Sequence, residues 1–165
     1  MIGTNLESFK NIIRMKNIYA SYYLQNKFKK YIRMIVSKYI FTNIYIDGLP
    51  LNDNENKGLG KITFIIDPSI LDYKKCYFNK GWISDINDKT IVMNNNINYV
   101  INYLKTHYTY PYILTHEALF KKNISICFII GIICDKELEN SVRKYLNKYG
   151  YIKIKIFNKF PTFIC

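Results

Sequence analysis

The segment from Ile124 to Phe157 constrains the fold of this chain more than any other. It opens with an apolar run that extends to Ile133, continues at helical period, and ends with an alternating run after Gly150. A continuous apolar run is typical of a strand buried on both faces, and alternation is typical of a strand with one solvated face. The segment predicts a strand, a helix and a second strand, with the first strand central and the second nearer an edge of the sheet.

The predicted helix carries signals at both of its ends. Asp135 is a suitable N-cap, and Glu137 and Glu139 place negative charge in the first turn, where the helix dipole favours it. Gly150 stands where a glycine commonly ends a helix. Apolar and aromatic residues recur at helical spacing between these ends, at Leu138, Val142, Tyr145, Leu146 and Tyr149. One face of this helix is therefore expected to pack on the sheet.

The first forty residues predict a basic helical arm. Thr4 and Glu7 have the spacing of a capping box, and an apolar pattern follows through Ile13. A second pattern runs from Ala20 to about Ile40, with apolar residues on one side and Lys27, Lys29, Lys30, Arg33 and Lys38 on the other. Such a pattern is shared by a core helix with a lysine surface, a helix on a membrane surface and a helix on RNA.

The middle of the chain predicts short strands. Residues 43–46 and 61–66 are expected to form a hairpin with a long polar tip, followed by strands at 76–78 and 90–93. A helix is expected over 97–104 and a helical turn over 115–119. The predicted fold is α/β (α+β): a two-layer sandwich with a mixed sheet of four to six strands. The arm occupies residues 1–40 and a single domain occupies residues 41–165.

The net charge of +12 is placed unevenly along the chain. Residues 1–40 hold eight basic residues and one acidic residue, residues 41–98 hold six and seven, and residues 99–165 hold ten and four. Lys, Asn, Ile and Tyr are abundant, and all four have AT-rich codons. In an AT-rich genome, mutational drift alone can therefore raise the number of lysines. Because drift would spread the charge evenly, its gathering at both ends favours a polyanionic partner over a merely solvated surface.

The cysteines show no paired spacing. Cys76, Cys127, Cys134 and Cys165 are expected to be free thiols in a reducing compartment, with no disulfide-linked partner. The longest apolar run is too short for a membrane span, and the N-terminus lacks the apolar core of a secretory signal. An intracellular, mitochondrial location is the expectation.

Phosphate and calcium motifs fail on spacing. Gly58-Leu-Gly-Lys61 resembles part of a P-loop, but Glu55 stands where the first glycine belongs and Ile62 where a hydroxyl residue belongs. The run that starts at Asp53 imitates a calcium loop, yet Lys57 and Phe64 occupy ligand positions. Neither nucleotide binding through a P-loop nor calcium binding is predicted.

Catalytic and zinc motifs fail as well. His107-Tyr-Thr109 is half of the paired His-x-Thr element of two-histidine phosphoesterases, and His116 supplies no second half. The two histidines and the scattered cysteines miss zinc spacings. A Cys–His nucleophilic pair remains an alternative, because such partners need only meet in space, and Asp85 and Asp88 suit a turn better than a catalytic site. No catalytic residue, metal or cofactor is predicted.

Basic residues interleaved with aromatic residues are the feature that points to a function, namely nucleic-acid binding. Lysines and arginines would bind phosphates and tyrosines would stack on exposed bases. The predicted contacts are Lys10, Arg14, Lys16, Lys27, Lys29, Lys30, Tyr31, Arg33, Lys38, Lys153 and Lys155. In composition the chain resembles ribosomal proteins encoded in organelles.

The sequence favours a non-catalytic, RNA-binding structural subunit of a large ribonucleoprotein, above all a ribosomal protein of a mitochondrial ribosome. Its partners would be rRNA and neighbouring proteins. The alternatives are an assembly subunit of another large complex, such as a respiratory complex or a phage or viral factor, and a small enzyme with an unrecognised site.

Overall fold

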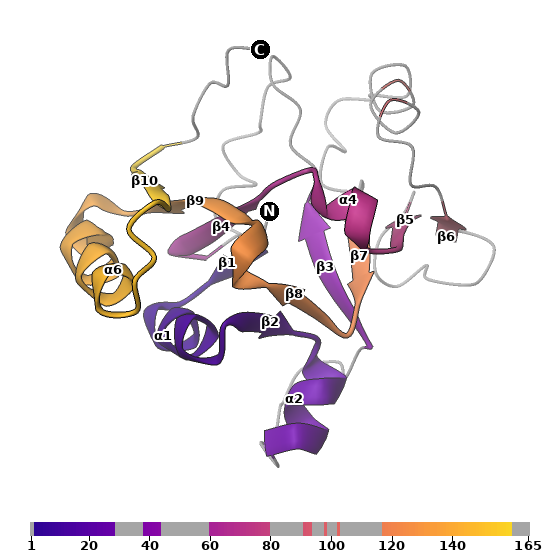
Figure 1. The fold of residues 1–165 in the computed structure, drawn as a ribbon, viewed down its shortest axis with the longest axis horizontal. Coiled ribbons are helices and arrows are strands. Elements are labelled where there is room, and N and C mark those ends of the chain that lie inside the picture. Colours follow the sequence, from indigo (N-terminus) through magenta and orange to yellow (C-terminus); the bar gives the residue numbers. More distant parts are fainter. Residues whose placement is uncertain are drawn as a thin grey trace. The chain divides into compact units, whose positions relative to one another are not determined.

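The computed structural model of the chain describes residues 2–28, 38–43, 60–79, 91–93, 98, 102 and 117–159. The chain divides into two compact units. Unit 1 comprises Met1–Asn17, Tyr45–Asp67 and Ser125–Cys165, and unit 2 comprises Ile18–Ile44 and Pro68–Ile124. Helices and strands occur in both (Figure 1), which confirms the α+β class expected from the sequence.

Unit 1 is built on a mixed sheet. Its strands are β1 (Ile2–Thr4), β4 (Ile62–Ile66), β9 (Ile129–Cys134) and β10 (Lys155–Phe157), and its helices are α1 (Leu6–Met15) and α6 (Lys136–Lys148). The strand order is β1-β4-β9-β10. β4 pairs antiparallel with both β1 and β9, whereas β9 and β10 run parallel. The predicted strand, helix and strand of the C-terminal region are confirmed, with β9 central and β10 at an edge.

The apolar run before α6 is not one strand. It is divided into β8 (Asn123–Ser125), a 3-10 turn η3 (Ile126–Phe128) and β9. Ser125 causes the division, because its Oγ accepts the N–H of Cys127 at 3.4 Å and so starts a turn. The second strand is also shorter than predicted, since Ile152 is 72% exposed and the ladder begins only at Lys155.

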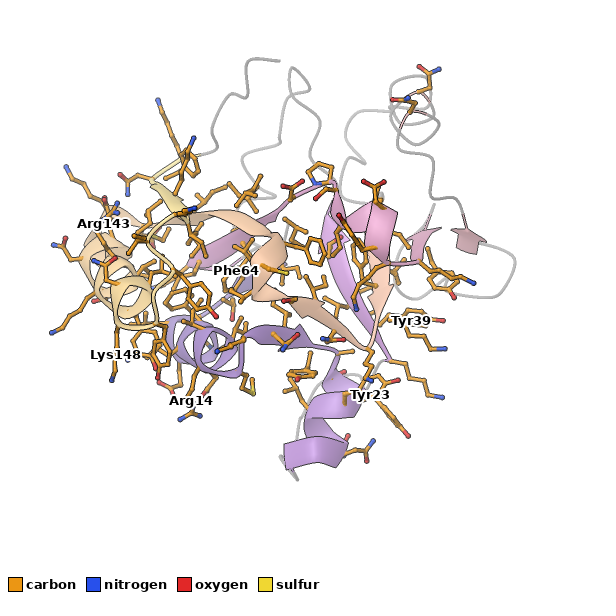
Figure 2. The ribbon with its side chains drawn as sticks, viewed as in Figure 1. Arg14, Tyr23, Tyr39, Phe64, Arg143 and Lys148 are labelled. Atoms are coloured by element: carbon orange, nitrogen blue, oxygen red, sulfur yellow. The ribbon has the colours of Figure 1, made fainter. Side chains whose placement is uncertain are left out.

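An aromatic core fastens α1 and α6 to the sheet of unit 1. The N-cap of α1 is Asn5, one residue after the predicted Thr4, and its Oδ1 accepts the N–H of Ser8 at 2.8 Å. Phe9 of α1 is fully buried and stacks on Phe64 of β4, with ring centroids 5.9 Å apart. The ring of Tyr145 in α6 lies 6.2 Å from that of Phe9. Both helices therefore share one aromatic core with β4, in which Phe64 lies inside and Arg143 and Lys148 project outward (Figure 2).

Unit 2 contains a four-stranded antiparallel sheet in the order β3-β7-β5-β6. Its strands are β3 (Tyr39–Asn43), β5 (Cys76–Asn79), β6 (Ile91–Met93) and β7 (Glu117–Lys121), and its helices are α2 (Ser21–Phe28) and α4 (Ile70–Tyr73). β2 (Asn17–Tyr19) pairs with β8 in a separate two-stranded sheet. Ala118, Leu119 and Phe120 are all buried, so β7 is covered on both of its faces.

Three local predictions for β3, β4 and β7 are wrong. Tyr39 and Ile40 belong to β3 rather than to a helix, and residues 117–119, the described part of the predicted helical turn, belong to β7. β3 and β4 lie in different sheets, so the two strands do not pair as a hairpin, and residues 44–59, which include the predicted tip, lie outside the described residues. The three errors share one cause. β3 pairs with β7, which is remote in sequence, and pairing between distant segments overrides local preference.

The N-terminal region, where the sequence predicts a helical arm, includes β1 and β2 besides α1 and α2. The helix predicted over 97–104 falls almost entirely outside the described residues. No helix in the described part of the chain is long and apolar enough to span a membrane.

Candidate functional site

The residues predicted to bind nucleic acid are distributed over both units. Lys29, Lys30, Tyr31 and Arg33 lie outside the described residues, and Lys27 is placed only as a position in α2. Unit 1 carries Lys10 and Arg14 on α1, Lys16 at its C-cap, Lys153 before β10 and Lys155 in β10. Unit 2 carries Lys38, which directly precedes β3. The structure therefore does not bring these residues together within one unit.

Arg14 and Lys38 show what such residues contact. An Nη atom of Arg14 donates to Oδ1 of Asn11 at 2.8 Å, on the exposed side of α1. The ammonium of Lys38 lies 5.5 Å from the centroid of the Tyr22 ring, which is a cation–π distance. Both cations remain at the surface, and neither forms an ion pair with a described carboxylate.

Two of the described cysteines, Cys76 and Cys134, are buried and poorly suited to act as nucleophiles. Burial raises the pKa of the Cys76 thiol to about 12, so it stays protonated at neutral pH. Burial also raises the pKa of Cys134. Cys127 is exposed, and its Sγ lies 3.1 Å from the Oγ of Ser125. His107 and His116 lie outside the described residues, and the described part of the chain holds no cluster of His, Cys, Asp and Glu that could bind a metal.

A row of three polar residues crosses the sheet of unit 2. Glu117, the first residue of β7, pairs with Asn43 at the end of β3 and with Asn79 at the end of β5. Residues that pair directly in an antiparallel sheet belong to the same face. The row Asn43–Glu117–Asn79 therefore places one carboxylate residue between two amide residues on one face of the sheet.

The backbone beneath this row is held firmly. β7 is hydrogen-bonded on both sides, by β3 and by β5. Next to the row, the Oγ1 of buried Thr42 donates to the carbonyl of Ala118 at 2.8 Å. A site on a paired central strand is positioned more accurately than one on a loop. The structure thus fixes the three Cα positions of the row independently of any bound molecule.

The same face carries aromatic residues in the rows that follow. Tyr77 pairs with Leu119, two residues along β7 from Glu117, and Phe41 pairs with Leu119 from the other side. Tyr39 pairs with Lys121, one row further on. The rings of Tyr39 and Tyr77 come from strands on opposite sides of β7 and meet edge to face with centroids 5.5 Å apart.

Chemically, the row and the aromatic residues complement each other. A carboxylate can stabilise a developing positive charge or accept a proton, and amide groups can donate and accept hydrogen bonds around it. Aromatic rings offer flat apolar surfaces for a planar heterocycle. These residue types suit a cationic or glycosidic centre beside an aromatic ring system.

Sequence reasoning missed this site. Glu117 was available as a signal, because it is a charged residue at the start of the apolar run Ala118 to Phe120. Its meaning depends on Asn43 and Asn79, which are remote in sequence and become its neighbours only through strand pairing.

Comparison with known families decides where the chain belongs. The sequence model of a family of unknown function, DUF5846, matches residues 2–109, about two thirds of the chain. The chain belongs to the DUF5846 family. The matched region contains Asn43 and Asn79 and ends before Glu117, so two of the three residues of the row lie within it. Comparison with curated protein sequences finds no similar protein.

Among solved structures, this DUF5846 member is similar to DarT from Thermus sp. 2.9, determined in complex with carba-NAD+. The match has a TM-score of 0.62, covers 94% of this chain and 92% of that chain, and has 11% sequence identity. The similarity extends over nearly the whole length of both proteins, and at this identity it establishes a shared fold.

The comparison corrects the functional interpretation drawn from the sequence. The chain has the fold of DarT, and neither match is a ribosomal protein. The expectation of a mitochondrial ribosomal protein, an RNA-binding structural subunit of a ribonucleoprotein, is therefore wrong. Neither match supports the alternative of an assembly subunit. The positive charge of the chain was a poor guide to its function, because proteins with unrelated activities share a lysine-rich composition.

Proposed function

We propose that the protein binds NAD+ and transfers its ADP-ribose group, with the row Asn43–Glu117–Asn79 at the reacting bond. The observation that carries the proposal is the fold shared with a protein bound to carba-NAD+, across 94% of this chain. The residue types on one face of the unit 2 sheet support it independently, because they match the chemistry that this substrate requires.

The ligand itself indicates the reaction. Carba-NAD+ carries a methylene group in place of the ring oxygen in the ribose next to nicotinamide. That oxygen supplies the electron pair that stabilises an oxocarbenium-like transition state when the bond between the ribose C1′ and nicotinamide breaks. The analogue keeps the shape of NAD+ and resists this cleavage, so it suits a site at which NAD+ would react.

Glu117 is the residue we assign to the reaction. As the bond from C1′ to nicotinamide breaks, neutral nicotinamide leaves with the bonding electron pair and positive charge develops on the ribose. A carboxylate at this point stabilises that charge and can hydrogen-bond the 2′-hydroxyl group. The acceptor nucleophile then bonds to C1′, and its proton passes to the carboxylate and from there to solvent.

The neighbouring residues have supporting roles in this proposal. Asn43 and Asn79 would supply amide groups for the ribose hydroxyls or the nicotinamide carboxamide, and strand pairing sets their Cα positions relative to that of Glu117. Tyr77 is one row away, about 7 Å along the strand, and is suited to stack on a planar ring of the dinucleotide.

The proposal is tested by mixing the purified chain with NAD+ and measuring released nicotinamide, and by titrating carba-NAD+ calorimetrically. We expect binding of carba-NAD+ and slow nicotinamide release with water as acceptor. Glu117→Gln removes the charge at nearly constant volume and should lower the rate of release by about 100-fold or more. Glu137→Gln, an exposed acid on α6, is the matched control and should leave the rate unchanged.

Two results would overturn the proposal. If the folded wild-type chain binds neither NAD+ nor carba-NAD+, NAD+ is excluded as the substrate. Unchanged nicotinamide release by Glu117→Gln would remove Glu117 from the mechanism.

A further inference from the structure

A second feature of unit 2, the lysine cluster, consists of Lys38, Lys74 and Lys122. Lys122 stands between β7 and β8 with a φ of 74°. Its N–H donates to the carbonyl of Lys38 at 3.1 Å, and its own carbonyl accepts the N–H of Ala20 at 2.9 Å. These bonds hold Lys122 in a left-handed conformation that costs a non-glycine residue about 1–2 kcal/mol. The strain marks a position that its surroundings enforce.

Lys74 joins the cluster from the end of α4. Its ammonium group donates to the backbone carbonyl of Asn123 and to the Oδ1 of the same residue at 3.3 Å. This places the ammonium beside the residue that follows Lys122. Burial lowers the pKa of Lys74, and the positive charge of Lys122 lowers it further, which shows that the two charges act on each other.

No described carboxylate offsets these charges. The ion pair found among the described residues joins Arg143 and Glu139 in unit 1, and no acidic group of the described residues is among the causes that shift the pKa of Lys74. Lys38 and Lys122 are exposed, and the ammonium of Lys38 is held over the Tyr22 ring. Like charges gathered at one turn repel each other unless an anion binds there.

We propose that Lys38, Lys74 and Lys122 form a binding site for a small phosphate-bearing ligand. A phosphate group has several acceptor oxygens, and ammonium groups bind it as point charges. The contacts that link these three residues lie around one turn, at Lys122 and Asn123, so we take a single phosphate or diphosphate group as the ligand rather than an extended polymer.

This site is separate from the row that contains Glu117. Lys121, the last residue of β7, lies four residues from Glu117, on the order of 13 Å in an extended strand, and Lys122 follows it. The phosphates of a dinucleotide are only a few bonds from the reacting C1′ atom. A dinucleotide whose ribose lies at Glu117 therefore leaves the lysine cluster available for a different phosphate.

Isothermal titration of the full chain with inorganic pyrophosphate and with AMP tests the proposal. We expect saturable binding of one equivalent, with the two ligands competing because the phosphate is the part that is recognised. Lys74→Gln and Lys122→Gln should each weaken Kd about tenfold or more. Lys144→Gln, an exposed lysine on α6 of unit 1, is the matched control and should bind like wild type.

Two further variants show whether a loss of phosphate binding comes from the removed charge, from unfolding or from damage to the proposed NAD+ site. Lys122→Gly removes the charge and suits the positive φ, so it should lose phosphate binding without a lower unfolding temperature. Glu117→Gln should retain phosphate binding, which distinguishes this site from the proposed NAD+ site. Failure of both small ligands to bind, binding of an oligonucleotide alone, or an equal loss in Lys144→Gln would overturn the proposal.

Discussion

The two units of this protein place polar residues differently in their sheets. In unit 1, the central strands β4 and β9 carry mainly apolar residues, and α1 and α6 join them through the rings of Phe9, Phe64 and Tyr145. In unit 2, the central strand β7 begins with Glu117 between two asparagines. Both units bury apolar residues, including Leu119 and Phe120 of β7. The row of unit 2 differs from them in its polar residue types, and we propose that these residues serve the reaction and contribute less to stability than the aromatic core of unit 1.

The largest loss of stability is expected when the Phe64 side chain is removed from the aromatic core of unit 1. Phe64→Ala should lower the free energy of unfolding by about 3–5 kcal/mol, because it deletes a fully buried aromatic side chain and leaves a cavity. Glu117→Gln should change it far less. Urea unfolding of both variants checks the contrast, and an equal loss of stability would mean that the row is structural.

A smaller effect is expected where β10 lies against β9. A Cβ at Gly131 would lie 2.8 Å from Cε2 of Phe157 and 3.0 Å from Cδ1 of Ile65, so Gly131→Ala should cost about 1–3 kcal/mol through overpacking. Adding Phe157→Leu should restore part of this loss in thermal unfolding.

Gly150→Ala is the matched control for Gly131→Ala. Gly150 has a φ of 80° and no atom within 4 Å of an added Cβ, so its substitution strains only the backbone. Phe157→Leu should not rescue it. Rescue of both variants would show that the contact with Phe157 is not the cause.

In unit 2, the buried thiol of Cys76 should make stability sensitive to alkaline pH. Its pKa is raised from 9.0 to about 12 in the folded chain, so the unfolded chain loses this proton first as pH rises. The contribution is fully present below pH 9.0 and should decrease by about 1.4 kcal/mol per pH unit between pH 9.0 and about 12.

Urea unfolding of wild type and Cys76→Ala at several pH values isolates the contribution of this thiol. The stability advantage of wild type over the variant should narrow above pH 9.0. An advantage that stays constant with pH would exclude Cys76 as the source of the pH dependence.

The smallest effect is expected on the surface of unit 1. Arg143 and Glu139 form an ion pair at 3.4 Å one helical turn apart, and the arginine side chain is half exposed. Arg143→Ala should therefore change the free energy of unfolding by only about 0.3–0.5 kcal/mol, and high salt should reduce the difference further. A loss above about 1 kcal/mol in denaturant unfolding would show that this ion pair contributes more to stability than an exposed pair is expected to.

Local sequence patterns predicted the elements whose identity depends on their own residues. The helical spacing of Val142 and Leu146 and the stop at Gly150 located α6, and both apolar residues are buried. The apolar run before α6 located β9 at the centre of its sheet. These signals work because burial on one face requires a fixed period within a single segment.

Pairing between distant segments could not be predicted in the same way. The run Ala118 to Phe120 has no pattern that separates a short strand from a helical turn, and pairing with β3 and β5 decided the outcome. The predicted hairpin failed because chain neighbours were assumed to be sheet neighbours, whereas β3 and β4 lie in separate sheets.

The candidate site depends entirely on such pairing. Glu117, Asn43 and Asn79 are ordinary polar residues in the sequence and form a row only in the folded sheet. The lysine cluster depends equally on the turn at Lys122, whose positive φ no local signal announces. Charge alone predicted a polyanionic partner and located neither feature.

The pairing of β7 with a strand on each side affects which amino-acid substitutions this protein can accept. Its Cα positions are set by backbone bonds to β3 and β5, so an exchange of amino acid at position 43, 79 or 117 alters the chemical groups and leaves the scaffold in place. Substitutions at these three positions can therefore change what the face binds without first rebuilding its architecture.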